Sequence, residues 1–115
     1  MENKYQIIEL PKNFDPRGNL TVVEQGINIP FDMKTISWKY KMSHDKLFSS
    51  ENHTDHYLFL VALHGTFCIR LFQDDATEST LSLSNPHQGI IISPDTSYQI
   101  TSVQEDTVIL ELSSK

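Results

Sequence analysis

One apolar run constrains the fold of this chain more than any other feature. The run extends from Tyr57 to Leu63 and is followed by His64 and Gly65. It is too short to cross a membrane, and it suits a strand that is buried on both faces. The β-rich residues 66–72 come directly afterwards. Because two-residue connections that carry glycine favour hairpins, we expect these two strands to pair with each other.

Other short β-rich segments are spaced along the chain, separated by clusters of Pro, Gly, Asn and Asp. One cluster, residues 15–19, predicts the turn of a first hairpin between residues 5–10 and 20–24. No segment shows a convincing helical period. The pattern predicts an all-β fold, an antiparallel sandwich or barrel, within one domain that spans residues 1–115. The remaining strands are expected at residues 34–41, 57–63, 66–72, 79–83, 89–93, 98–103 and 107–112.

Charge and composition exclude several classes of function. The formal net charge of −6 argues against nucleic acid as the main partner, because phosphate binding requires a basic surface. Cys68 is the single cysteine, so no internal disulfide can form, which fits a reducing compartment. The stretch from Met1 to Leu10 contains no apolar segment typical of a signal peptide. We therefore expect a cytoplasmic protein that has no membrane association.

The densest group of ionisable side chains lies just before the apolar run. If the strand extends back to Glu51, its period of two places Glu51, His53, Asp55 and Tyr57 on one face. A carboxylate beside an imidazole can hold a proton near neutral pH, which suits proton transfer. The alternative is that these side chains are solvated and bonded to the backbone at the end of a strand. The pattern alone leaves both interpretations open.

A metal site would use the histidines of this segment as ligands. Metal centres in proteins usually combine three or more His, Cys or carboxylate ligands. His53 and His56 fall on opposite faces of a strand, and the other histidines fall in expected loops or turns. We therefore expect no metal ion and no other cofactor. A metal-dependent site that uses His53 and His56 stays as an alternative.

Several separated motifs resemble, in order, those of the cupin-type nucleotide-sugar 3,4-ketoisomerases. Residues 14–31, FDPRGNLTVVEQGINIPF, are similar to the family's D-x-R-G-x-L, acidic residue and N-I-P-F. Residues 59–66, FLVALHGT, resemble a strand of the family's barrel, and residues 85–94 resemble a later N-P…G…P segment. The resemblance implies a cupin, or jelly-roll, antiparallel β-barrel that forms a homodimer. It also implies a metal-free isomerisation of thymidine-diphosphate-linked 4-keto-6-deoxyglucose in deoxysugar and polysaccharide biosynthesis.

The match is weaker at the residues that carry the family's chemistry. A gap-free count places the family's two histidines on Glu51 and His53, so a glutamate replaces the first of them. The family's paired tyrosines fall on Ser37 and Trp38. Family members also usually continue into an acidic, tyrosine-rich tail beyond the position of Lys115. The resemblance is thus more specific for the fold than for the active site.

The resemblance nevertheless implies roles for particular residues. His53 is the expected acid/base group, and Glu51 is expected to orient it or to carry the second proton. Arg17 is the candidate for binding the diphosphate if it faces the cleft. The alternative is that Arg17 is a structural residue bonded to its own loop. The other expected ligand-binding residues are Tyr57, Tyr98 and Gln99.

Three functions are consistent with these features. The first is a 3,4-ketoisomerase-like enzyme with an altered site that acts on a thymidine-diphosphate-linked sugar. The second is a catalytically inactive cupin that binds a sugar nucleotide or assists a partner enzyme of the same pathway. The third is a metal-dependent small-molecule cupin. They differ in whether His53 and Glu51 point into a barrel that has room for a sugar.

Overall fold

The computed structural model describes residues 4–41, 52–72 and 78–115. All regular structure in these ranges is β-strand, which confirms the all-β prediction. Within the same ranges, no helix is long and apolar enough to span a membrane. The strands are β1 Tyr5–Glu9, β2 Lys12–Asn13, β3 Leu20–Thr21, β4 Thr35–Lys39, β5 Asn52–Thr54, β6 Leu58–His64, β7 Phe67–Phe72, β8 Glu78–Leu83, β9 Gln88–Ile92, β10 Thr96–Val103 and β11 Val108–Ser113.

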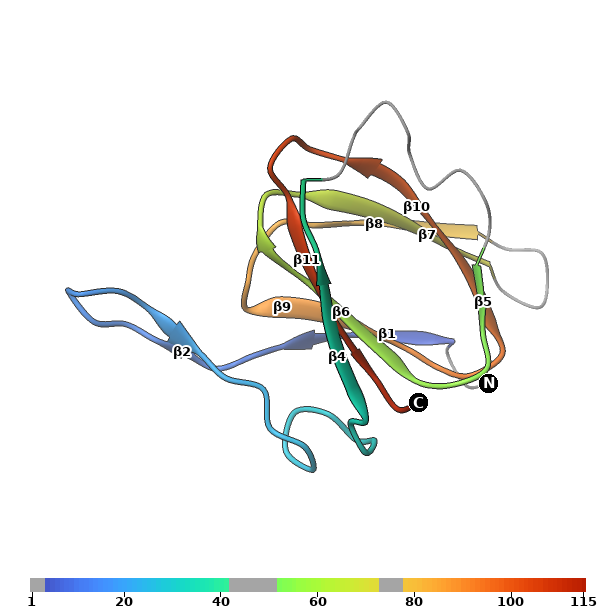
Figure 1. Ribbon diagram of the computed structural model, residues 1–115, viewed down its shortest axis with the longest axis horizontal. Coiled ribbons are helices and arrows are strands. Elements are labelled where there is room, and N and C mark those ends of the chain that lie inside the picture. The colour runs from blue at the N-terminus through green and yellow to red at the C-terminus, as the bar shows by residue number, and fades with distance from the viewer. Residues whose placement is uncertain (1–3, 42–51, 73–77) are drawn as a thin grey trace.

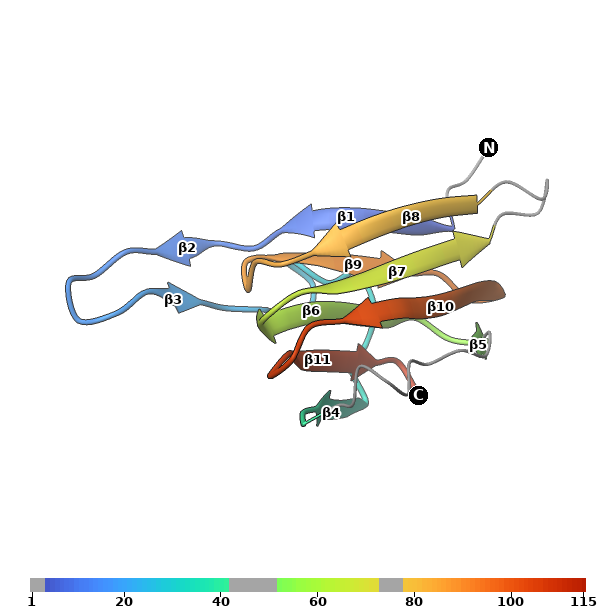
Figure 2. The same ribbon diagram turned by 90° about the horizontal axis from the view of Figure 1, so that it is seen from above.

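Two antiparallel sheets face each other and enclose the main core (Figures 1 and 2). The larger sheet has the strand order β1-β9-β6-β11-β4, and the smaller sheet has the order β5-β10-β7-β8. Strands β1 and β8 lie at one side of this sandwich, and the edge strands β4 and β5 lie at the other (Figure 2). The short pair β2 and β3 extends away from both sheets as a separate hairpin.

Strand β6 is buried on both faces, as the apolar run predicts. Leu58, Leu60 and Ala62 pack in the core between the two sheets. Phe59 and Val61 point to the outside of the larger sheet, where a second apolar cluster covers them. The middle strand of the larger sheet is therefore shielded from water on both sides.

The N-I-P-F segment supplies part of that outer cover. Ile29 is fully buried and Phe31 is only 7% exposed. The loop around them is closed locally, because the Gly26 N–H donates to the Ile29 carbonyl at 2.8 Å and the Glu24 N–H donates to Asn28 Oδ1 at 2.8 Å. Burying an apolar side chain of this size stabilises a fold by roughly 1.5–3 kcal/mol. This motif therefore has a packing role.

The hairpin predicted at His64 and Gly65 is wrong. Strand β6 pairs with β9 and β11, whereas β7 pairs with β8 and β10 in the other sheet. Gly65 has a φ of 80°, and the Thr107 hydroxyl accepts a hydrogen bond from the Thr66 N–H at 3.2 Å. The same hydroxyl donates to the Thr66 carbonyl at 3.1 Å. These contacts hold a crossing between the two sheets.

The continuous row expected from Glu51 to Tyr57 is also wrong, because a bend separates β5 from β6. The two strands belong to different sheets. In the bend, the Thr54 hydroxyl donates to the His56 carbonyl at 2.7 Å and accepts from the His56 N–H at 3.2 Å. Asp55 and Tyr57 lie within this bend, so they do not continue the face that carries His53.

The turn predicted at residues 15–19 is confirmed, but the first strand of the hairpin differs. Lys12 and Asn13 pair with Thr21 and Leu20, so β2 replaces the expected partner. The expected first strand instead forms β1 and pairs with β9. Pro11 lies between β1 and β2 and separates the two segments. The hairpin is therefore shorter than expected and stands apart from the sheets.

Edge strand β4 presents an apolar row and a polar row to opposite faces. Ile36 and Trp38 lie opposite residues of β11 that belong to the outer apolar cluster, yet they stay 59% and 58% exposed. Ser37 lies opposite Glu111, whose row faces the space between the sheets. The apolar row of β4 thus faces outward and its polar row faces inward.

Replacing Gly65 by alanine should destabilise the fold more than the same change at Gly26. Both glycines have positive φ values, 80° and 84°, so alanine costs roughly 1–2 kcal/mol at either position. At Gly65 the added Cβ would also meet the Thr107 hydroxyl and lie 2.8 Å from Thr107 Cα, whereas nothing lies within 4 Å at Gly26. We expect this overpacking to remove roughly a further 1–3 kcal/mol of unfolding free energy. Urea denaturation measures both variants, and equal losses would contradict this account of the crossing.

Candidate active site

The inner face of the larger sheet carries a carboxylate near its β4 edge. Glu111 lies on β11 in the same inward row as Ile109, and it stands in register with Leu60 on one side and Ser37 on the other. Ile109 and Leu60 belong to the core between the sheets. Glu111 itself is partly buried. The sheet thus places an acid at the border between an apolar core and the polar row of β4.

Tyr98 lies on the inner face of the smaller sheet. It is 9% exposed and packs within the core between the sheets. Burial raises the pKa of the Tyr98 hydroxyl above its ordinary value, and the charge of Glu111 raises it further. The phenol therefore stays protonated throughout the neutral range and can act as a proton donor.

Tyr98 and Glu111 occupy equivalent places in the two sheets. Tyr98 lies on β10, next to the edge strand β5, and Glu111 lies on β11, next to the edge strand β4. These edges lie at the same side of the sandwich, which we call the β4–β5 side (Figure 2). One proton donor and one proton acceptor therefore face the space between the sheets at this side, and these are the groups that acid/base chemistry requires.

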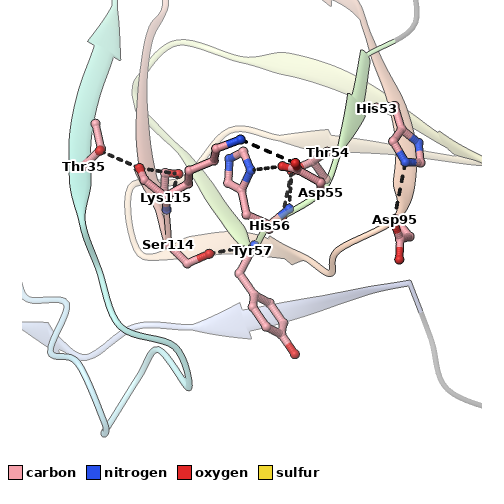
Figure 3. A network of polar contacts seen from close by, with 10 residues as sticks. Thr35, His53, Thr54, Asp55, His56, Tyr57, Asp95, Ser114 and Lys115 are labelled. Carbon is pink, nitrogen blue, oxygen red and sulfur yellow. Dashed lines mark hydrogen bonds and ion pairs between the residues drawn. The ribbon is translucent and has the colours of Figure 1, made fainter.

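His53 lies on the opposite face of the smaller sheet. It pairs with Ser97, and its Nδ1 lies 3.1 Å from Ser97 Oγ. Its Nε2 lies 3.7 Å from the Asp95 carboxylate (Figure 3). The neighbouring Thr54 is 3% exposed and faces inward, so alternation directs the His53 ring away from the space between the sheets. Glu51, its expected partner, lies outside the described residues.

A polar network ties the bend between β5 and β6 to the C-terminal residues (Figure 3). His56 Nδ1 lies 2.7 Å from Asp55 Oδ1, and Lys115 Nζ lies 3.4 Å from Asp55 Oδ2. The hydrogen bond from His56, and then that from Lys115, holds the pKa of the Asp55 carboxyl below its ordinary value. The Tyr57 N–H donates to Ser114 Oγ at 2.9 Å. These contacts fix the bend and hence the direction of β5.

Arg17 lies in the turn of the β2–β3 hairpin, which extends away from both sheets (Figure 1). Its guanidinium donates two hydrogen bonds to Asp15, at 3.0 and 3.1 Å, and its side chain is 90% exposed. This pairing lowers the pKa of the Asp15 carboxyl and raises the pKa of Arg17. Within this chain, the structure does not bring Arg17 and Tyr98 together.

The other two predicted ligand residues also lie apart from Tyr98. The Tyr57 ring stacks on Phe31, with 5.3 Å between ring centroids, at the edge of the outer apolar cluster. Gln99 follows Tyr98 on β10 and therefore faces the outer side of the smaller sheet, opposite Arg70. Among the described residues that the sequence predicted for the site, Tyr98 is the one that lies between the sheets.

The histidines proposed for a metal site have separate partners. His56 is engaged with Asp55, whereas His53 lies against Ser97 and Asp95. In the part of the chain that the structure describes, no three His, Cys, Asp or Glu side chains gather as metal ligands would. The described residues thus offer no donor set for the metal-dependent alternative.

A surface hollow of about 230 Å³ lies elsewhere, on the outer face of the larger sheet. It is lined by Gln6, Ile8, Ile91 and residues 26–30. None of these side chains is ionisable, so the hollow has no group that moves a proton near neutral pH. We therefore place the candidate active site at the β4–β5 side of the sandwich.

The two facing antiparallel sheets form a cupin-type sandwich. Residues 3–115 match the family model described as FdtA, "WxcM-like, C-terminal". The chain therefore belongs to this family, which confirms the resemblance seen in the sequence.

Relatives of known structure or activity agree with this family assignment. The chain is 27% identical over 114 residues to TDP-4-oxo-6-deoxy-alpha-D-glucose-3,4-oxoisomerase from Aneurinibacillus thermoaerophilus, covering 99% of this chain and 80% of the relative. It is also similar to a double variant of the QdtA 3,4-ketoisomerase from Thermoanaerobacterium thermosaccharolyticum, solved in complex with TDP. The two chains are 29% identical and superpose with a TM-score of 0.88, and the match covers 100% of this chain and 83% of that one. The WlaRB TDP-quinovose 3,4-ketoisomerase from Campylobacter jejuni shares the fold, with a TM-score of 0.91 at 20% identity over 99% of this chain and 87% of that one.

Glu111 is the candidate site residue that the sequence reasoning did not single out. A signal for it exists, because Glu111 is the charged residue within the otherwise apolar residues 108–112. The period of two places it in the same row as Ile109, which is buried. A carboxylate in an apolar row is informative, since burying an unpaired charge is costly.

The raised pKa of Tyr98 predicts a specific loss of stability at alkaline pH. An unfolded chain ionises tyrosine near pH 10, about its ordinary pKa, whereas folded Tyr98 ionises at higher pH. The contribution to stability is therefore present below about pH 10 and is lost as pH rises through the folded-state pKa. Tyr98→Phe should reduce the alkaline loss in unfolding free energy, measured by urea denaturation. Tyr57→Phe is the control at a side chain that is 37% exposed and does not lie on β4, and an equal effect in both variants would contradict the assignment.

Proposed function

We propose that this protein catalyses the 3,4-ketoisomerisation of a TDP-linked 4-keto-6-deoxy sugar. The match to the FdtA family over residues 3–115 carries the proposal. The fold similarity to QdtA in complex with TDP supports the nucleotide part of the substrate. A variant of the same QdtA was solved in complex with TDP-4-keto-6-deoxyglucose, which supports the sugar part.

The reaction requires groups that move protons on neighbouring carbons of the sugar. A base removes the proton from the carbon next to the keto group, and an acid protonates the keto oxygen, which gives an enediol. A proton is then delivered to the former keto carbon. Each step asks for side chains within hydrogen-bonding reach and in the correct protonation state. The described groups that face the space between the sheets, Tyr98 and Glu111, supply one acid and one base.

The roles of His53 and Glu51 stay predictions. In the described orientation, His53 reaches a ligand only from the outer face of the smaller sheet. Tyr98 and Glu111 reach a ligand from between the sheets. Variants of these residues therefore report on which face of β5 and β10 the sugar binds.

Deuterium exchange tests the proposed function directly. The protein should incorporate deuterium at the carbon next to the keto group when it is incubated with TDP-4-keto-6-deoxyglucose in deuterium oxide, since the abstracted proton exchanges with solvent. Mass spectrometry or NMR measures the incorporation, and calorimetry measures TDP binding in parallel. TDP binding without exchange would contradict catalysis and would indicate a sugar-nucleotide-binding protein.

We also propose that the protein forms a homodimer through edge strand β4. Ile36, Trp38 and Tyr40 expose 59%, 58% and 61% of their surface on this strand and just beyond it. In the described chain β4 has a neighbouring strand on one side only. Such an edge is a ready site for pairing with another chain. A second copy would cover both the apolar row and the open edge.

The β2–β3 hairpin supports an assembly of more than one chain. It carries Arg17 away from both sheets of its own chain (Figure 1). A diphosphate contact by Arg17 therefore fits the site of a neighbouring copy better than the site of its own chain. In that contact, the phosphate oxygens would replace the Asp15 carboxylate as partner of the guanidinium.

Sedimentation equilibrium tests the dimer. The parent protein should sediment as a dimer, and Trp38→Lys should shift it to a monomer because a charge would be buried at the proposed interface. Ile27→Lys is a matched control, since Ile27 is 73% exposed and does not lie on β4. A monomeric parent, or a Trp38→Lys protein that stays dimeric, would refute the interface.

A further inference from the structure

Glu111 and Tyr98 are two ionisable groups at the border of an apolar core. Their inward neighbours, Ile109 and Ile100, are buried at 1% and 2% exposure. Among the described residues, neither the Glu111 carboxylate nor the Tyr98 hydroxyl is a buried atom that lacks a hydrogen-bond partner. Both polar groups therefore stay accessible at the border of the core, where a ligand could reach them.

The fold directs these two side chains toward the same space from opposite sheets. Glu111 faces inward from β11 and Tyr98 faces inward from β10, the strands next to the two edges of the β4–β5 side. Burial, and then the charge of Glu111, raises the pKa of the Tyr98 hydroxyl. The two side chains therefore border the same volume from opposite sheets.

The neighbouring edge strand leaves Glu111 approachable. Ser37 is the residue of β4 that lies directly opposite Glu111, and its side chain is small. Ser37 is itself exposed. The carboxylate is thus covered by the core on its Leu60 side and open on its Ser37 side. An acid/base group needs this combination of shielding from bulk water and access for the substrate.

We propose that Glu111 and Tyr98 are the proton-transfer pair of this protein, with Glu111 as the base and Tyr98 as the acid. The assignment rests on the proposed ketoisomerase function. It deepens that function by moving the chemistry from His53, on the outer face of the smaller sheet, to the space between the sheets.

The proposed steps balance in protons and electrons. The Glu111 carboxylate takes the proton from C3, the C3–H electron pair forms the C3–C4 double bond, and the Tyr98 hydroxyl protonates the C4 oxygen. The product is an enediol beside a neutral carboxylic acid and a phenolate. In the second half, the carboxylic acid delivers its proton to C4 while the phenolate takes the proton of the C3 hydroxyl. The sugar becomes a 3-ketone, and both side chains return to their starting states.

The electrostatics suit these assignments. The buried phenol stays protonated at neutral pH, because burial and the Glu111 charge both disfavour phenolate. When Glu111 accepts the C3 proton its charge disappears, so the phenol loses the repulsion that had opposed its ionisation. Proton uptake by one group thereby assists proton release by the other.

Three variants test the pair by deuterium exchange with TDP-4-keto-6-deoxyglucose. Glu111→Gln and Tyr98→Phe should each slow exchange by roughly 10²–10⁴-fold, the usual contribution of an acid/base group, while TDP binding stays within about twofold in calorimetry. The surface control Glu105→Gln should exchange at close to the parent's rate. Exchange at the parent's rate in Glu111→Gln would overturn the pair and leave the proposed function standing. A parent that shows no exchange would overturn both.

The pH profile gives a second test that does not depend on the folding of Glu111→Gln. The rate should fall at high pH as the Tyr98 phenol ionises, since its pKa is raised above the ordinary value. Tyr98→Phe should remove this alkaline fall. An alkaline fall that persists unchanged in Tyr98→Phe would overturn the assignment of Tyr98 as the acid and with it the pair.

Discussion

The burial of β6 on both faces is the constraint on which the rest of the structure depends. Its inward residues, Leu58, Leu60 and Ala62, need the smaller sheet to cover them. Its outward residues, Phe59 and Val61, need the second cluster that includes the N-I-P-F segment. Because β6 is the middle strand of the larger sheet, one of its faces must be covered by the smaller sheet and the other by the outer apolar cluster. The centre of the larger sheet is therefore apolar on both faces, and the candidate site lies beside one of its edges.

The strands could be predicted from local pattern, whereas their partners could not. The alternation in residues such as 67–72 is a property of the segment itself, so most strand positions were correct. Whether the turn at Gly65 forms a hairpin or crosses between sheets depends on contacts with Thr107, which lies 41 residues beyond Thr66. Glycine permits both turns. Packing across the sandwich decides between them, and the sequence around Gly65 carries no signal for that packing.

The same limitation explains the outcome for the candidate site. The expected row from Glu51 to Tyr57 assumed an unbroken strand, but contacts with the C-terminal residues, including one between Tyr57 and Ser114, bend the chain there. Tyr98 was expected to bind a ligand because of the family resemblance, and its inward direction agrees with the strand's alternation. Glu111 is the charged residue in the otherwise apolar residues 108–112. Because a single glutamate near the end of a strand is common on solvated faces, this pattern alone does not distinguish a site residue.

Strand β4 connects the chemistry of the site with the proposed assembly. Its inward residue Ser37 borders Glu111, whereas its outward residues Ile36 and Trp38 carry exposed apolar surface. Because alternate side chains of one strand cannot move independently, a partner that packs on the outward row also holds the inward row in place. Edge strands are otherwise the least constrained strands of a sheet, since they pair on one side only. A dimer formed through β4 would therefore order the wall of the active site, and the substrate would in turn favour the assembled form by linkage.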